Sequence, residues 1–386
     1  MDKQLFCLHG GRRAFGRDQA VHRKPGKVGE EEETLITIQF KLLPNAQQDR
    51  LLQETVKEYV SSANDLIDYC NGQMRTPRLS SSSFTASLPS AVKNEIVNMV
   101  KSILRKHGRG TCGALPVMQK PVATWNNQNY KLQGGCIIFP VWADGKSTRI
   151  KVDAAIEEYQ RERLAGKLGS FRLTQKNGKW IAQIAVEAPP AAVAGKGAMG
   201  VDLGLKNPAV AVTDAGKAKF CGNGRMNKYM KRKHRARRRA LGKAKKQKAI
   251  NKLNNKEQRW MRDQDHKTSR EIVNFATSNN IGTIKMEELA NIRQSARTSR
   301  KNEKNLHTWS FFRLANYIEY KAQLAGIKVE YVDPAYTSQL CPCCGKANHA
   351  KDRKYQCVCG YRGHRDMVGA INILSAPAIA GNRRSA

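Results

Sequence analysis

Cysteines near the C-terminal end of the chain have the spacing of a metal site. Two close pairs lie about a dozen residues apart, and a glycine that permits a tight turn follows each pair, at Gly345 and Gly360. Soft thiolate sulfurs grouped in this way suit a tetrahedral zinc ion. We therefore predict that Zn²⁺ is bound by Cys341, Cys344, Cys357 and Cys359.

Other ligands remain open at this zinc site. One residue separates Cys357 from Cys359, fewer than the usual two, and Cys343 could replace a neighbour. His349 and His364 are further candidates, although such histidines more often lie at the surface or contact phosphate. Four thiolates would close the coordination sphere, so we expect a structural rather than a catalytic ion.

Three acidic residues, far apart in the sequence, have the character of a second metal site. Asp202 lies inside an apolar strand, Glu287 ends another, and Asp366 heads a helix-like run that follows the cysteines. A buried carboxylate is costly unless it binds a cation, although Asp202 could instead pair with a lysine. Converging carboxylates require hard cations, and oxygen ligands favour Mg²⁺ or Mn²⁺. Two such ions could hold and hydrolyse a phosphodiester.

The charge balance indicates what the chain binds. Lys and Arg number 68 against 32 Asp and Glu, giving a formal charge of +36 and a pI near 10.1. Nucleic acid is the commonest polyanion. A membrane surface is the competing partner, but we find no apolar run near the roughly 20 residues of a spanning helix and no signal peptide before the first strand. Clustered rather than dispersed cysteines favour a reducing cytoplasm.

The basic residues concentrate between 226 and 270, where 18 Lys or Arg face three acids. A solvated charged helix normally interleaves both signs, so mutual repulsion here must be relieved by bound phosphates. The basic helical segment extends over 226–280. One face of its first half is predicted to bind nucleic acid through Lys228, Arg232, Arg235, Arg239 and Lys243.

The first half of the chain reads as strands with a helical insertion. Residues 1–33 have no periodic pattern and are predicted to form a flexible arm. Strand patterns at 34–44 and 120–190 predict a β-barrel-like domain, with a hairpin turn at Asn177-Gly178. Two apolar stripes at helical spacing, the first capped by Asn45, predict a helical lobe over 45–119. Residues 191–197 form the linker out of this domain.

The second half alternates strands and helices. Its elements follow the order of a ribonuclease H-like α/β domain. A strand with a three-stranded meander comes first, followed by helix, strand, helix, strand and helix. We expect this domain to comprise 198–336 and 360–376, with the cysteine region 337–360 inserted and 377–386 as a tail. In this fold, acids on the first strand, on a later strand and on the last helix converge, as required for Asp202, Glu287 and Asp366.

Four segments resemble a known family. They are Met199-Gly200-Val201-Asp202-Leu203-Gly204, Met286-Glu287-Glu288-Leu289, Thr337-Ser338-Gln339 with the cysteine pairs, and Arg365-Asp366. These are similar to the RuvC nuclease and zinc-ribbon segments of TnpB, the transposon-encoded RNA-guided DNA endonuclease, and of its descendants, the miniature type V CRISPR effectors. The resemblance covers about 34–375.

The resemblance implies a function and a partner set. It makes Asp202, Glu287 and Asp366 the RuvC metal ligands, with Glu287 preferred over Glu288. It implies a wedge-type β-barrel with an inserted recognition lobe that grips a guide RNA and a short motif beside the DNA target. A homodimer, which would double this small lobe, is compatible with the chain length. Val368 and Gly369 depart from the family pattern, where Asn and Ala are usual.

Two other functions are open at this point. Some relatives bind DNA under RNA guidance without cutting it, and they generally lack one or more acids, whereas this chain keeps all three. The other open function is that of a RuvC-fold accessory protein of transposition that acts without RNA. Whether a transposon or a CRISPR system encodes the chain does not follow from its sequence.

Overall fold

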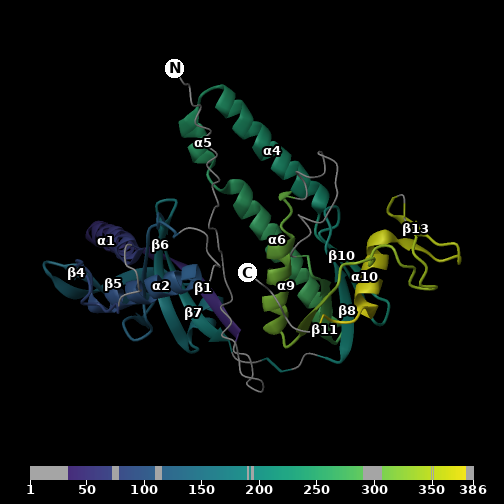
Figure 1. The fold of residues 1–386 in the computed structure, drawn as a ribbon, viewed down its shortest axis with the longest axis horizontal. Helices are drawn as coiled ribbons and strands as arrows, with labels where there is room; N and C mark the ends of the chain where they lie inside the picture. The colour runs from purple at the N-terminus through teal and green to yellow at the C-terminus, as the bar shows by residue number, and fades with distance from the viewer. Residues whose placement is uncertain are drawn as a thin grey trace. The chain divides into compact units, whose positions relative to one another are not determined.

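The computed structural model describes residues 34–71, 78–108, 115–188, 191–192, 195–289, 307–348, 350 and 352–379 (Figure 1). The chain divides into two compact units, Met1–Pro189 and Pro190–Ala386, each with its own sheet and core. The predicted arm, 1–33, lies outside the described residues. Within the described ranges, no helix has the length and apolar character needed to span a bilayer.

The first unit is built on a seven-stranded antiparallel sheet in the order β2-β6-β7-β1-β5-β4-β3. Along the whole of β7, buried residues alternate with more exposed ones, because one face of the sheet covers the core. The hairpin predicted at Asn177-Gly178 joins β6 to β7, with φ of 55° and 72° at these two residues. The strands are β1 (Thr34–Leu43), β2 (Val122–Trp125), β3 (Lys131–Gln133), β4 (Cys136–Ala143), β5 (Lys146–Ala155), β6 (Leu168–Lys176) and β7 (Lys179–Ala188).

This sheet curls around an aromatic core. Trp125 on β2 stacks on Phe171 at 5.0 Å between ring centroids and meets Phe139 of β4 edge-on at 4.9 Å. Its indole Nε1 donates a hydrogen bond of 2.9 Å to the Pro140 carbonyl, also on β4. Four strands separate β2 from β4 in the sheet order. Their contact therefore requires strong curvature, in keeping with the barrel-like domain expected from the strand pattern.

Two long helices, α1 (Ala46–Asn71) and α2 (Ser90–Gly108), form the insertion after β1. The predicted cap is present, because Asn45 Oδ1 accepts the Gln48 amide at 2.8 Å and Gln48 Oε1 accepts the Asn45 amide at 3.1 Å. The apolar stripes of both helices join the core of the sheet. The short helix α3 (Glu158–Leu164) and strand β3 were not predicted, since neither spans a full hydrophobic period.

The second unit contains a five-stranded mixed sheet in the order β10-β9-β8-β11-β12. The meander β8–β9–β10 is antiparallel, and β11 lies parallel to both β8 and β12. Figure 1 shows this sheet between helices α6 and α9 on one side and α10 on the other. Its strands are β8 (Gly197–Asp202), β9 (Ala209–Thr213), β10 (Ala218–Cys221), β11 (Ile281–Glu287) and β12 (Lys328–Val332).

The helices of this unit follow the predicted order of elements. The basic segment forms α4, which starts at a side-chain cap from Asn223 and continues through Gly242, and then α5 and α6. Gly200 on β8 allows the last helix to approach closely, since a Cβ there would lie 2.0 Å from the Ala370 carbonyl oxygen. The helices are α4 (Gly224–Lys243), α5 (Gln247–Leu253), α6 (Lys256–Ser278), α9 (Phe311–Gln323) and α10 (Arg365–Ser375). Strands β13 (Lys354–Gln356) and β14 (Arg362–His364) form a small hairpin before α10.

Candidate metal centres and nucleic-acid surface

Asp202 and Glu287 end two neighbouring parallel strands. Met286 of β11 is in register with Val201 of β8, so the next residue along each strand is one of these two acids. The carboxyl ends of parallel neighbours meet at one edge of a sheet, which brings the two side chains together there. Asp366 is the second residue of α10, the helix that packs against β8. We call Asp202, Glu287 and Asp366 the acidic centre.

The pKa of Asp202 reflects the presence of the other two acids. Burial, followed by the charges of Glu287 and Asp366, raises the pKa of Asp202 to about 8, against the opposing charges of Arg353 and Arg365. Glu287, rather than its neighbour Glu288, is the acid on β11 whose charge acts on Asp202. The alternative pairing with lysine finds no support, since none of the described groups that shift this pKa is a lysine.

Side chains outside the acidic centre orient its members. Asn207 Nδ2 donates to Asp366 Oδ2 at 2.7 Å, and the Arg353 guanidinium pairs with the other carboxylate oxygen. His364 caps α10 by accepting the Asp366 backbone amide on Nδ1 at 3.2 Å. The Thr337 hydroxyl donates to Glu287, whose pKa is raised by burial.

Sequence reasoning did not single out Asn207 or Arg353, whereas Thr337 lies in a family motif and His364 was considered only as a zinc ligand. Asn207 could have been identified from the sequence, because it lies in the loop that follows Asp202. By contrast, no spacing rule pairs Arg353 with Asp366.

The oxygen donors of the acidic centre are of the kind that hard cations prefer. Within the described part of the chain, no three carboxylate oxygens from different residues all lie within 4.8 Å of one another, so the acids do not form a cage for a single ion. Burial and the charges of the other two acids disfavour ionised Asp202, and a bound cation would relieve this cost. Oxygen ligands of this kind suit Mg²⁺ or Mn²⁺. Their role as ligands stays a prediction.

The four predicted cysteines do come together. Their Sγ atoms all lie within 4.8 Å of one another, with Cys341 to Cys359 and Cys344 to Cys357 each at 3.6 Å. A tetrahedral ion with Zn–S bonds of about 2.3 Å places its sulfurs about 3.8 Å apart, so the cluster has the right size. Cys343 is exposed outside the cluster, and His364 caps α10 instead. His349 lies outside the described residues.

The chemistry of these thiols also favours a bound cation. Burial opposes ionisation of Cys341, but the backbone amides of Cys344 and Cys343 lower its pKa to about 7. The Tyr361 amide favours the thiolate at Cys359, whereas burial and the neighbouring thiols raise its pKa to about 12. Four adjacent thiolates would need a bound cation to coexist, and four sulfurs at this spacing suit zinc. We call residues 340–364 the cysteine knuckle.

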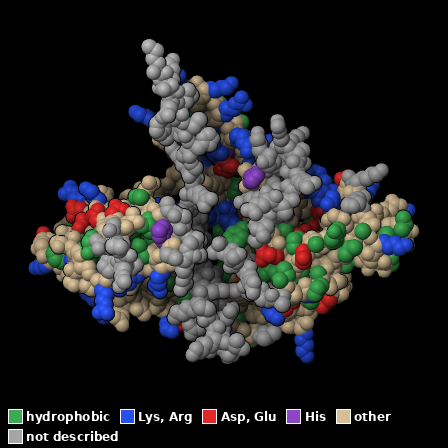
Figure 2. All heavy atoms as spheres, viewed as in Figure 1, with side chains coloured by type: hydrophobic (Ala, Val, Ile, Leu, Met, Phe, Trp, Pro, Cys, Tyr) green, Lys and Arg blue, Asp and Glu red, His purple; other side chains and the backbone are tan. Residues whose placement is uncertain are grey.

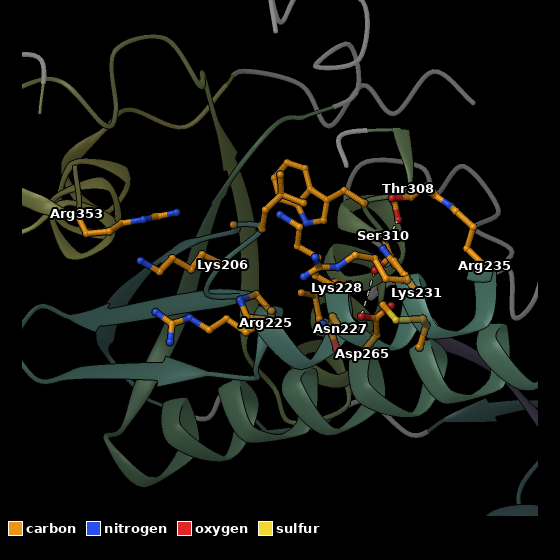
Figure 3. Close-up of a pocket in the computed structure, with 18 residues that line it drawn as sticks. Lys206, Arg225, Asn227, Lys228, Lys231, Arg235, Asp265, Thr308, Ser310 and Arg353 are labelled. Carbon is orange, nitrogen blue, oxygen red and sulfur yellow. Dashed lines mark hydrogen bonds between the residues drawn. The ribbon is translucent and has the colours of Figure 1, made fainter. Parts of the chain in front are cut away.

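The predicted basic face of α4 borders a cavity of about 780 Å³ (Figure 3). Lys228, Arg232 and Arg235 line it, whereas Arg239 and Lys243 lie further along the helix and are exposed. In Figure 2, Lys and Arg side chains surround the region of α4 and α5. The surface is thus suited to phosphate, and its binding of nucleic acid stays a prediction.

These features define a two-unit chain whose mixed α/β domain carries an acidic centre and a four-cysteine cluster. Its relatives are TnpB and the miniature type V CRISPR effectors, and the resemblance predicted from the motifs is confirmed. A family model described as "Cas12f1-like, TNB domain" matches residues 311–373, and one described as "Probable transposase" matches residues 182–293.

Individual relatives agree with the family models. A TnpB-like protein of Methanocaldococcus jannaschii is 37% identical over 139 residues, which is 35% of this chain and 50% of that protein. The CRISPR-associated endodeoxyribonuclease Cas12f1 of Sulfoacidibacillus thermotolerans is 38% identical over 136 residues, 34% of this chain and 31% of the relative. The matched regions thus span half of one relative and about a third of the other.

A solved structure shows the same fold at greater coverage. The structure described as "Cryo-EM structure of the Cas12f1-sgRNA-target DNA complex" matches with a TM-score of 0.62 and 18% identity, over 85% of this chain and 82% of that one. The mixed α/β architecture expected from the sequence is therefore shared with a Cas12f1 protein.

Proposed function

We propose that the chain is an RNA-guided DNA endonuclease that hydrolyses phosphodiester bonds with divalent metal ions. The observation that carries this proposal is that two strand ends and the start of one helix bring Asp202, Glu287 and Asp366 together, where burial and then the charges of the other two acids raise the pKa of Asp202 to about 8. An apolar strand that ends in such a carboxylate is costly to stability, and such costs are typical of functional sites.

The architecture supports a RuvC assignment. A mixed five-stranded sheet with its acids at strand ends and on the last helix is the arrangement of a ribonuclease H-like domain. We assign residues 198–336 and 360–376 to RuvC and 337–360 to a zinc ribbon. In the first unit, 34–44 and 120–190 correspond to a wedge-type barrel, and 45–119 to a recognition lobe.

The residues of the acidic centre have separable tasks. Asp202 experiences the charges of both other acids, so Asp202, Glu287 and Asp366 together would hold the divalent ions, and the side chains around them would set their orientation. Thr337 fixes the orientation of Glu287, and Asn207 and Arg353 fix that of Asp366. When bound, Mg²⁺ or Mn²⁺ would supply activation of water and neutralisation of the leaving oxygen.

Target choice is assigned to base pairing with a guide RNA and to a short flanking motif read by the protein. The net charge of +36 supports a nucleic-acid partner. The Cas12f1 protein with the matching fold was solved as a complex with sgRNA and target DNA. A homodimer is compatible with this function, and light scattering of the RNA-loaded protein would detect it.

The decisive experiment isolates the protein from cells that carry its flanking DNA and sequences any RNA that copurifies. The loaded protein should cut matching DNA when Mg²⁺ is present, and Asp202→Ala should abolish cutting while target binding persists. Cutting of unmatched plasmid without RNA at physiological salt would contradict RNA guidance.

The same purification tests an RNA-independent accessory function in transposition. The "Probable transposase" description of the matching family model favours that alternative. It predicts DNA binding by protein that carries no discrete RNA. Tight guided binding with no product in Mg²⁺ or Mn²⁺ would instead indicate a nuclease-silent regulator, against which the intact acidic centre argues.

A further inference from the structure

Asn372 joins the last helix to the turn that leads into the cysteine knuckle. Its side-chain Nδ2 donates to the Thr337 carbonyl at 2.6 Å and to the Leu340 carbonyl at 2.8 Å. A side-chain amide has two N–H donors, so Asn372 uses both of them on this segment, which we call the 336–340 turn. Asn372 lies on α10, six residues after Asp366. The helix that carries one acid of the centre is thus bonded to this turn.

The 336–340 turn presents a hydroxyl group to a second acid. Thr337 is 6% exposed, and its hydroxyl donates to Oε1 of Glu287 at the end of β11. Burial raises the pKa of Glu287, and this hydrogen bond opposes the rise, so the hydroxyl favours the carboxylate form. The Pro334 carbonyl lies 3.2 Å from the same hydroxyl, which has one proton to donate. A small movement of the turn would therefore let the hydroxyl leave Glu287 for Pro334.

Local preference does not favour the shape of this turn. Tyr336 has a φ of 61°, in the left-handed region that glycine and asparagine adopt more readily than an aromatic residue. Its side chain is 65% exposed, so burial of the ring does not impose this conformation. The Gln339 and Leu340 amides donate to the Tyr336 carbonyl at 2.9 and 3.2 Å, which closes the turn without joining it to α10. The two bonds from Asn372 supply that connection.

The C-terminal end of α10 is attached to the sheet by other contacts. Lys285 Nζ on β11 donates to the Ala376 carbonyl, directly after the helix, at 2.9 Å. The Ile379 amide donates to the Tyr331 carbonyl on β12 at 2.8 Å. Removing the Asn372 side chain should therefore release the turn while the helix stays in place.

We propose that Asn372 is a positioning residue that acts through Thr337 to fix Glu287 relative to Asp366. The inference rests on the proposed nuclease function, because it concerns how these acids would share metal ions. Asn372 holds the Thr337 backbone, the Thr337 hydroxyl holds Glu287, and α10 carries both Asn372 and Asp366. Metal sites need ligands held to within about 0.5 Å, which contacts behind the ligands provide.

A first measurement tests whether Asn372 anchors the turn. Hydrogen exchange is followed in full-length protein without RNA or metal, in Asn372→Ala and in the control Asn279→Ala. Asn279 Nδ2 also donates to a backbone carbonyl, that of Phe275 at 2.8 Å, but it lies before β11, at the opposite end of that strand from Glu287. We expect the Gln339 and Leu340 amides to exchange at least about threefold faster in Asn372→Ala alone. Unchanged exchange would overturn the anchoring.

A second measurement tests the effect on the acidic centre. Mn²⁺ binding to full-length protein without RNA is followed by the electron paramagnetic resonance signal of the free ion, so the readout needs no cleavage. Asn372→Ala and Thr337→Val should each bind Mn²⁺ roughly three- to tenfold more weakly, the effect of one lost hydrogen bond behind a ligand. Asn279→Ala should stay within about twofold of wild type, since distant sites act independently.

The double variant tests the path through Thr337. If Asn372 acts through that hydroxyl, Asn372→Ala combined with Thr337→Val should bind Mn²⁺ no more weakly than Thr337→Val alone. Losses that multiply would overturn this path.

Asp202→Ala separates this inference from the proposed function. Mn²⁺ binding that Asp202→Ala leaves unchanged would overturn the nuclease site and the positioning role together. Binding that depends on Asp202 but is unchanged in Asn372→Ala would overturn the positioning role alone.

Discussion

Arg353 of the cysteine knuckle forms an ion pair with Asp366 of the acidic centre. The Asp366 side chain is 9% exposed and that of Arg353 is 33% exposed, so water screens the pair only in part. Val368, two residues after Asp366, packs in the small core of the knuckle with Cys341 and Cys357. The four-cysteine cluster therefore supports the helix that presents a catalytic candidate.

Replacing Arg353 should impair metal use more than target binding. Without the guanidinium, Asp366 loses one of its orienting contacts and Asp202 loses a charge that lowers its pKa. We expect the Arg353→Gln variant to cut about tenfold more slowly, which corresponds to about 1.4 kcal/mol, or one pKa unit. It should also need severalfold more Mg²⁺. Arg353→Lys should recover part of the lost activity. Arg362→Gln, at an exposed position in the same hairpin, is the matched control. Unchanged Mg²⁺ dependence would refute the orienting role.

Removing the metal from the knuckle should also abolish cutting. Elemental analysis of wild type should find about one zinc ion per chain. Cys344→Ser should lose that zinc and most of its cleavage, because the knuckle that holds Arg353 opens. Cys343→Ser, one residue away but outside the cluster, should retain both. Zinc retained in Cys344→Ser would argue for a different ligand set.

Gly200 should be intolerant of any side chain. An added Cβ would lie 2.0 Å from the Ala370 carbonyl, so α10 would have to move away from β8. We expect Gly200→Ala to lower the free energy of unfolding by about 3 kcal/mol or more, visible as a fall of roughly 2–4 °C in Tm per kcal/mol. Gly242→Ala, within α4 and with nothing inside 4 Å, should instead raise stability by up to about 1 kcal/mol. Equal effects of the two substitutions would contradict the close approach.

Sequence reasoning reached the parts of this chain that short-range pattern controls. Strand alternation, the cap at Asn45 and the Asn177-Gly178 turn are local, and the structure contains all three. The cysteines converge because turns place each pair. The contact of Arg353 with Asp366 and the basic cavity depend instead on how the knuckle, α4 and the loop after β8 pack, which no local pattern encodes.

His266 should make the second unit sensitive to acid. Burial, then the charges of Lys321, Arg262 and Arg313, lowers its pKa to about 4, and its ring stacks on Tyr317 at 4.0 Å. The unfolded chain takes up a proton near pH 6.5 while the folded chain does not, so stability falls as pH drops from about 6.5 to 4. We expect this loss to reach roughly 1–3 kcal/mol, given partial exposure. His266→Phe should flatten the profile, measured by urea unfolding; an unchanged slope would exclude His266 as its source.

Gly369 gives the last prediction, because it touches the acidic centre directly. A Cβ there would lie 3.1 Å from Asp202 Oδ2, tight enough to displace the carboxylate slightly without forcing the helix away. Alanine is a better helix former by about 1 kcal/mol, which should offset the strained contact, so Gly369→Ala should keep its stability within about 1 kcal/mol of wild type. Its Mg²⁺ dependence should nevertheless shift by severalfold, since the displaced oxygen is a candidate metal ligand. A Mg²⁺ titration of cleavage measures this shift, and a variant with wild-type dependence would mean that Asp202 accommodates the methyl group without changing how it binds metal.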